Sequence, residues 1–107
     1  MSLDVYLRVV RPVTVFDANY THNCNTMADA AGIYQHVWRP EELGITQAGQ
    51  LIEPLAAGIA LMKAEPERFK ALNPANGWGS YDTFVPWLEK YLDACRENPD
   101  ALIEVSR

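Results

Sequence analysis

The segment that decides the fold class is Leu-Asp-Val-Tyr-Leu-Arg-Val-Val, residues 3 to 10. Apolar side chains alternate with the others along it, and successive side chains of a β-strand point to opposite faces of the sheet. The segment therefore predicts a strand with one buried face. The residues on that face are Leu3, Val5, Leu7 and Val9.

Two further segments predict strands. Arg11-Pro12 interrupts the first strand, because proline cannot donate a hydrogen bond to a neighbouring strand, and residues 13 to 16 predict a short second one. After the turn predicted at Asn98-Pro99-Asp100, apolar residues alternate again over residues 101 to 106. We expect the strands at the two ends of the chain to pair antiparallel in one small sheet.

Helical patterns occupy the middle of the chain. Apolar residues from Met27 to Trp38 follow the spacing of one helix face. Residues 46 to 62 predict a second helix, with Thr46 as its cap and a kink or restart at Pro54. A short turn of helix follows Glu65-Pro66, and Ser80 caps a last helix. The prediction is one α+β domain, residues 1–107, in which three to four helices cover a small antiparallel sheet.

Composition and charge narrow the functional classes. The net charge is −5, with nine basic residues scattered along the chain. Proteins that bind nucleic acids rely on clustered Lys and Arg, so DNA and RNA are disfavoured as main partners. The sequence shows no transmembrane run of about 18 apolar residues and no secretory signal. These features predict a cytoplasmic protein in which Cys24 and Cys95 are free thiols.

Reactive side chains are concentrated in residues 16 to 41, which hold both histidines and Cys24. If the helix of this segment began at His22, then Asp29 and His36 would lie on the same face, with successive members about 10 Å apart. That spacing is too wide for one metal ion. A thiol near a helix start can have a lowered pKa, but a buried apolar role is more common for cysteine. No metal, cofactor or catalytic residue is predicted.

A polar site is predicted where this helix begins, at Thr21-His22-Asn23. Free N–H groups and the helix dipole favour an anion there, and amide side chains can read the edge of a base. The alternative is that Thr and Asn only cap the helix, with His22 turned to water or to a neighbouring carbonyl. Arg39, at the other end of the helix, suits a phosphate or a carboxylate. Its alternative role is an ion pair with Glu41 or Glu42.

The loop Asn76-Gly77-Trp78-Gly79-Ser80-Tyr81 differs in kind from the other loops. Glycine on both sides of Trp78 lets the backbone take positive φ. The tryptophan either plugs a gap between helices, which is the interpretation we favour from its size, or offers a stacking surface to a ligand. Taken with the polar site, this loop completes the set of predicted ligand-binding residues. They are Asn19, His22, Asn23, Arg39, Trp78 and Tyr81.

Motifs along nearly the whole chain carry a family resemblance. They are Leu3-Asp4-Val5-Tyr6-Leu7, Thr21-His22-Asn23 with Met27-Ala28, Ala31-Gly32-Ile33-Tyr34 before Trp38-Arg39-Pro40-Glu41-Glu42, Asn76-Gly77-Trp78-Gly79 with Tyr81, and Ser106-Arg107. On these motifs the chain resembles a family of short bacteriophage and prophage proteins to which no activity is assigned. The resemblance implies a protein that acts in the cytosol of an infected or lysogenic bacterium, and it transfers no functional residue.

These observations lead to three hypotheses of function. The first is a binding protein for a small nucleotide-type molecule that sequesters a host defence signal, with a homo-oligomer as the expected assembly. In this hypothesis amides read the base, an aromatic ring stacks on it, and His22, Arg39 and the helix start hold phosphate. The second is a protein–protein inhibitor of a host factor. Its acidic surface would consist of Glu41, Glu42, Glu53, Glu65 and Glu67. The third is a small hydrolase or transferase with His22 as base, helped by Asp29 or Asn23.

Overall fold

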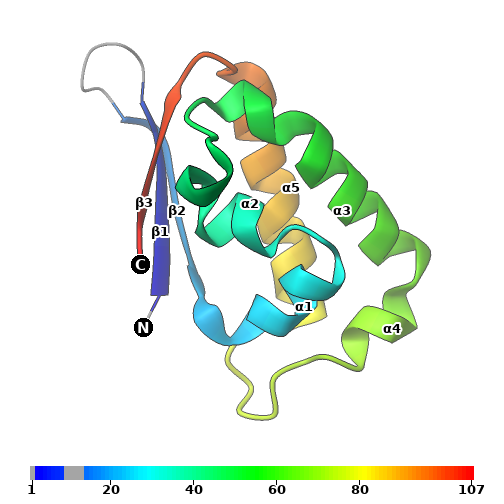
Figure 1. Cartoon of the computed structure of the whole chain (residues 1–107). Helices are drawn as coiled ribbons and strands as arrows, with labels where there is room; N and C mark the ends of the chain where they lie inside the picture. Colours follow the sequence, from blue (N-terminus) through cyan, green and yellow to red (C-terminus); the bar gives the residue numbers. More distant parts are fainter. Residues whose placement is uncertain (1, 9–13) are drawn as a thin grey trace.

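The computed structural model describes residues 2–8 and 14–107, which form an α+β fold of two layers, a sheet on one side and helices on the other (Figure 1). This confirms the predicted fold class. The strands are β1 (Ser2–Arg8), β2 (Thr14–Thr21) and β3 (Leu102–Ser106). The α-helices among the described residues are α1 (Asn25–Ala30), α2 (Tyr34–Trp38), α3 (Ile52–Ala64), α4 (Pro66–Lys70) and α5 (Tyr81–Glu97).

The sheet is antiparallel throughout and has the strand order β2-β1-β3. Leu3, Val5 and Leu7 of β1 are fully buried against the helices, as their alternation predicted. The side chains between them lie on the opposite, open face of the sheet. Predictions for residues 9 to 13, including the interruption at Arg11-Pro12, fall outside the described residues.

The second strand is longer than the sequence analysis predicted, because it continues to Thr21 rather than ending near Phe16. Its partly buried residues Phe16, Ala18 and Tyr20 stand opposite Leu7, Val5 and Leu3 and so face the helices. The residues between them share the open face with the alternate residues of β1. Asn19 and Thr21 are therefore strand residues, not residues of a loop before a helix.

The single helix predicted from Met27 to Trp38 is wrong, because the chain turns sharply between α1 and α2. Gly32 lies at the turn with a φ of 76°, in the left-handed region that glycine adopts without a steric penalty. A 3₁₀ turn, His22–Cys24, precedes α1. His22, Asp29 and His36 consequently do not share one helix face. The described residues form five α-helices, one more than the upper end of the expected three to four.

The two long helices begin near the residues that the sequence indicated. A 3₁₀ turn, Ala48–Leu51, leads into α3, and Gln47 with Gln50 forms a capping box there in place of Thr46. Pro54 falls in the first turn of α3, where proline is tolerated, because the α-helix begins only at Ile52, after the 3₁₀ turn. At α5, Ser80 accepts a hydrogen bond from the Thr83 N–H, which confirms the predicted cap.

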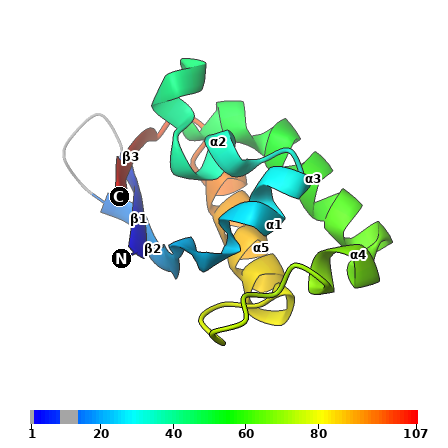
Figure 2. The same cartoon turned by 60° about the horizontal axis from the view of Figure 1, so that its bottom comes forward.

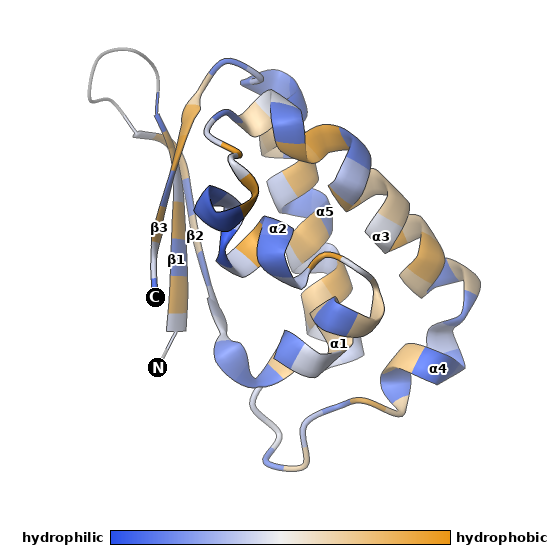
Figure 3. Cartoon of the chain, viewed as in Figure 1, coloured by the Kyte–Doolittle hydropathy of each residue, from blue (hydrophilic) through white to orange (hydrophobic). Residues whose placement is uncertain are grey.

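The core lies between the sheet and the long helices and is built from apolar residues of both layers. Figure 3 shows hydrophobic positions recurring along the strands and along the helices. The largest fully buried side chains of the core include Trp38, Phe84 and Tyr91. Below the core, the loop between α4 and α5 comes back beside the segment that joins β2 to α1 (Figure 2). This return brings residues 76 to 80 against the end of the sheet.

Candidate functional site

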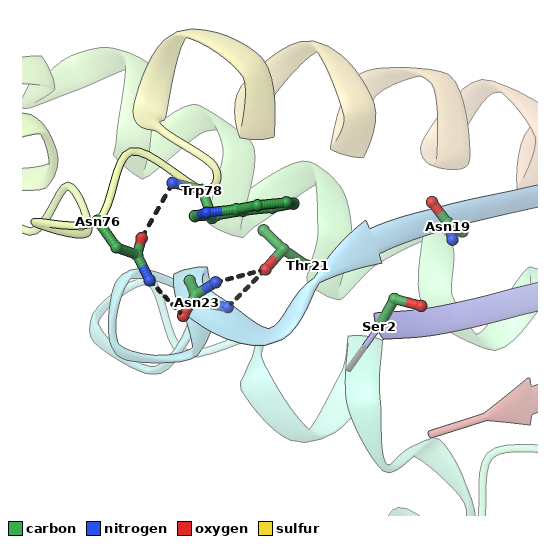
Figure 4. Close-up of a pocket in the computed structure, with 6 residues that line it drawn as sticks. All are labelled: Ser2, Asn19, Thr21, Asn23, Asn76 and Trp78. Carbon is green, nitrogen blue, oxygen red and sulfur yellow. Dashed lines mark hydrogen bonds between the residues drawn. The ribbon is translucent and has the colours of Figure 1, made fainter.

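A hollow of about 570 Å³ opens where the end of the sheet meets the loop between α4 and α5 (Figure 4). Its volume lies within the range of small-molecule sites, roughly 300–1,000 Å³. Every side chain in its lining is uncharged at neutral pH. The lining residues are Ser2, Asn19, Thr21, Asn23, Asn76 and Trp78.

The sheet supplies one wall of the hollow. Ser2 is paired with Thr21 across β1 and β2, while their neighbours Leu3 and Tyr20 are paired on the core side. Alternation therefore places Ser2, Thr21 and Asn19 together on the open face. These polar side chains come from regular strands, which hold their spacing more firmly than a loop would.

Hydrogen bonds join the sheet wall to the loop wall. The Asn23 Nδ2 group donates to Thr21 Oγ1 at 2.7 Å, and the Asn76 Nδ2 group donates to Asn23 Oδ1 at 3.3 Å. Asn76 Oδ1 accepts from the Trp78 N–H at 2.9 Å. Among the described residues, the Asn19 amide has no hydrogen-bond partner, so its donor and its acceptor are both available to a ligand.

Trp78 is 70% exposed. The favoured prediction that it plugs a gap between helices is therefore wrong, and the alternative of an exposed stacking surface fits. Gly77 and Gly79 on either side have φ values of 75° and 88°, so the backbone turns the indole out from the loop. In Figure 4 the ring extends from the loop toward Thr21, along one side of the hollow.

The Tyr20 hydroxyl anchors the loop from the core side. It accepts a hydrogen bond from the Ser80 N–H at 3.2 Å and lies 2.7 Å from Thr83 Oγ1. Gly79 fits tightly beside it, because a Cβ at that position would meet Thr21 Cγ2 at 2.7 Å and the Tyr20 hydroxyl at 3.2 Å. Partial burial of the Tyr20 hydroxyl raises its pKa above the usual value.

Cys24 belongs to this anchor and not to the hollow. Its thiol is fully buried and donates to the Tyr20 hydroxyl at 3.8 Å. Burial raises the pKa of the Cys24 thiol, which is the opposite of the lowered value considered for a reactive cysteine. Cys24 and Cys95 are both free and buried, as expected from the sequence.

Of the predicted site residues, Asn19, Asn23 and Trp78 line the hollow and the other three do not. His22 is half-buried and packs against Trp38, with ring centroids 6.3 Å apart; its buried Nε2 has no hydrogen-bond partner among the described residues. Arg39 donates to the Tyr34 hydroxyl and to Glu42, each at 3.2 Å. The Tyr81 hydroxyl donates to the Met62 carbonyl at 3.0 Å.

Three lining residues, Ser2, Thr21 and Asn76, are absent from the set of ligand-binding residues predicted from the sequence, although Thr21 and Asn76 stand in the two segments that the prediction singled out. A signal for Thr21 was present, because the alternation of apolar and polar residues continues from Phe16 to Thr21. Extending the second strand along that pattern would have put Asn19 and Thr21 on one face. The glycines marked the loop that Asn76 begins, but no local pattern marked the Asn76 side chain itself, which reaches the hollow through the return of that loop.

The helix start expected to bind an anion does not form the hollow. Cys24 stands at the N-cap of α1 without a side-chain hydrogen bond, and α1 has only six residues.

Residues 2–8 and 14–107 contain no group of three or more His, Cys, Asp or Glu placed to hold a metal ion. None of the helices described here is long and apolar enough to cross a membrane. Searches of family models, curated proteins and solved structures returned no match.

Proposed function

We propose that this protein binds a small nucleotide-type molecule, with the base of the ligand held in the hollow beside Trp78. The observation that carries the proposal is that one hollow is lined by an exposed indole and by the Asn19 amide, which has no hydrogen-bond partner among the described residues. Aromatic stacking holds any base by its flat face. The donor and acceptor of the Asn19 amide can then pair with the edge of the base, as Asn pairs with adenine.

The phosphate contacts suggested by the sequence have no counterpart in the hollow, since His22 and Arg39 do not line it. The proposal therefore rests on the base. In the bacteriophage setting that the family resemblance implies, tight binding without a reaction would withdraw a host defence signal from its receptor. Assembly into a homo-oligomer remains a prediction of the sequence analysis.

The competing hypotheses gain less from the geometry. Three of the five carboxylates expected to contact a basic host protein are in ion pairs, which reduces the negative charge that they present. These pairs are Glu41–Arg107, Glu42–Arg39 and Glu65–Arg68. For the hydrolase hypothesis, His22 is half-buried on Trp38, while Asp29 lines a different hollow together with His36.

Titration calorimetry with nucleosides and nucleotides tests the proposal. Trp78→Ala should weaken binding by about 1–3 kcal/mol, the usual contribution of one stacked base, whereas Trp78→Phe should retain part of it. Leu43→Ala is the matched control, because Leu43 is also an exposed apolar residue but does not line the hollow. If no nucleoside or nucleotide binds, or if the alanine variants of Trp78 and Leu43 bind equally well, the proposal fails.

A further inference from the structure

The charges around the hollow bear on which form of the ligand it accepts. None of the six lining side chains is charged at neutral pH. The nearest charged position that the strand pairing defines is Asp4, which stands directly opposite Asn19 on β2 and opposite Ser106 on β3. Directly opposed residues have Cβ atoms about 4.5–5.5 Å apart. A carboxylate therefore borders the hollow on the open face of the sheet.

The rest of the open face adds to this negative charge. Tyr6, the next residue of β1 on this face, is opposed by Asp17 on one side and Glu104 on the other. Among the residues that the structure describes, the cation of this face is Arg8, and it forms an ion pair with Glu104 at 3.2 Å. Asp4 takes part in none of the ion pairs among the described residues. A phosphate group over this face would meet negative charge that no unpaired cation of residues 2–8 and 14–107 on this face compensates.

We infer that the hollow selects an uncharged ribonucleoside over its phosphorylated forms, with Asp4 as the selecting residue. This inference rests on the proposed function and narrows it. The base stacks on Trp78 and pairs with Asn19, and its ribose extends over the sheet toward Asp4. A carboxylate accepts hydrogen bonds from ribose hydroxyls, as in dinucleotide-binding proteins, and repels a phosphate. One side chain thus favours the nucleoside in two ways.

The test compares adenosine, guanosine, cytidine and uridine with their 5′-monophosphates by titration calorimetry. The ribonucleoside that binds most tightly should bind about fivefold more tightly than its monophosphate, from the repulsion of two charges across several ångströms of hydrated surface. High salt should reduce this ratio, because salt screens exposed charges. The 2′-deoxynucleoside should bind more weakly than the ribonucleoside.

Asp4→Asn keeps the shape of the side chain and removes its charge, so it should bring the ratio close to one. Asp17→Asn is the control, because it removes the same charge from the same face at a position further from the hollow. If the monophosphate binds as tightly as the nucleoside in the unaltered protein, or if both variants change the ratio equally, the inference is overturned while the proposed function stands. If no member of either series binds, both fail.

Discussion

Replacing Gly79 with alanine would test how the loop that carries Trp78 is held in place. Gly79 has a φ of 88°, and a Cβ there would lie 2.7 Å from Thr21 Cγ2 and 3.1 Å from Cys24 Sγ. Gly77 provides a matched control two residues earlier in the same loop. Its φ is 75°, but a Cβ there would meet nothing within 4 Å. The two substitutions therefore share the backbone strain and differ only in the contact.

The expected magnitudes follow from these two effects. A non-glycine residue in the left-handed region costs about 1–2 kcal/mol, which both variants incur. Overpacking adds about 1–3 kcal/mol at Gly79 only. Thr21 cannot turn aside easily, because its hydroxyl accepts hydrogen bonds from the backbone and the side chain of Asn23. The total is about 2–5 kcal/mol for Gly79→Ala, the sum of the two ranges.

Thermal unfolding followed by circular dichroism measures the global effect. For a domain of this size, 1 kcal/mol corresponds to about 4 °C in Tm, so Gly79→Ala should melt about 4–12 °C below Gly77→Ala. The strain can also be relieved by local opening of the loop. In that case the Ser80 amide, which is bonded to Tyr20, should exchange faster with solvent in Gly79→Ala. Equal Tm values together with equal Ser80 exchange in the two variants would refute the reasoning.

Three further predictions concern the core. Gly58→Ala should destabilise the protein by about 1–3 kcal/mol in urea unfolding, because the added Cβ would lie 2.5 Å from Ile33 Cγ2. Adding Ile33→Leu, which lacks that methyl group, should restore part of the lost stability. If Gly58→Ala instead stabilised the protein, as the higher helix propensity of alanine alone would predict, the contact would be contradicted. Burial raises the pKa of Cys95 from 9.0 to about 12. Between pH 9 and pH 12 the unfolded chain releases the thiol proton while the folded chain keeps it. The free energy of unfolding should therefore fall by about 1.4 kcal/mol for each pH unit in this range. The urea midpoint should fall less steeply with pH in Cys95→Ala than in the unaltered protein. Because Cys24 and Cys95 are both buried, a thiol reagent should label neither in the folded protein at neutral pH and both after unfolding; rapid labelling of Cys24 in the folded state would show that it is accessible.

Patterns that depend on neighbours in the chain were predictable. Alternation over residues 3 to 8 identified β1 and its buried face, and Ser80 marked the start of α5 through a hydrogen bond that spans three residues. The break at Gly32 was harder to predict. A single glycine is tolerated inside many helices at a cost of about 1 kcal/mol. Here Ile33, the residue after Gly32, packs against Gly58 of α3. This contact between distant parts of the chain lies at the turn that separates α1 from α2, and no local pattern indicates it.

The candidate site was predictable only in part, for a similar reason. The side-chain chemistry of Asn19, Asn23 and Trp78 predicts a ligand site, and all three line the hollow. The chemistry of His22 and Arg39 predicts the same, but His22 packs on Trp38 and Arg39 donates hydrogen bonds to Tyr34 and Glu42. Residue type shows what a side chain can bind, whereas the direction in which it points depends on the elements around it.

The sequence by itself determined the α+β class, the buried face of the first strand, the start of the last helix and the glycine turns on either side of Trp78, because each follows from the steric and hydrogen-bonding preferences of residues a few positions apart. Only the tertiary structure decided that Asn76 and Trp78 line one hollow with Asn19 and Asn23, more than 50 positions away in the chain. This arrangement depends on the return of the loop to the sheet, held by the Tyr20 hydroxyl and by the narrow space beside Gly79. The tertiary structure also placed Asp4 beside Asn19, because strand pairing fixes which residues face each other.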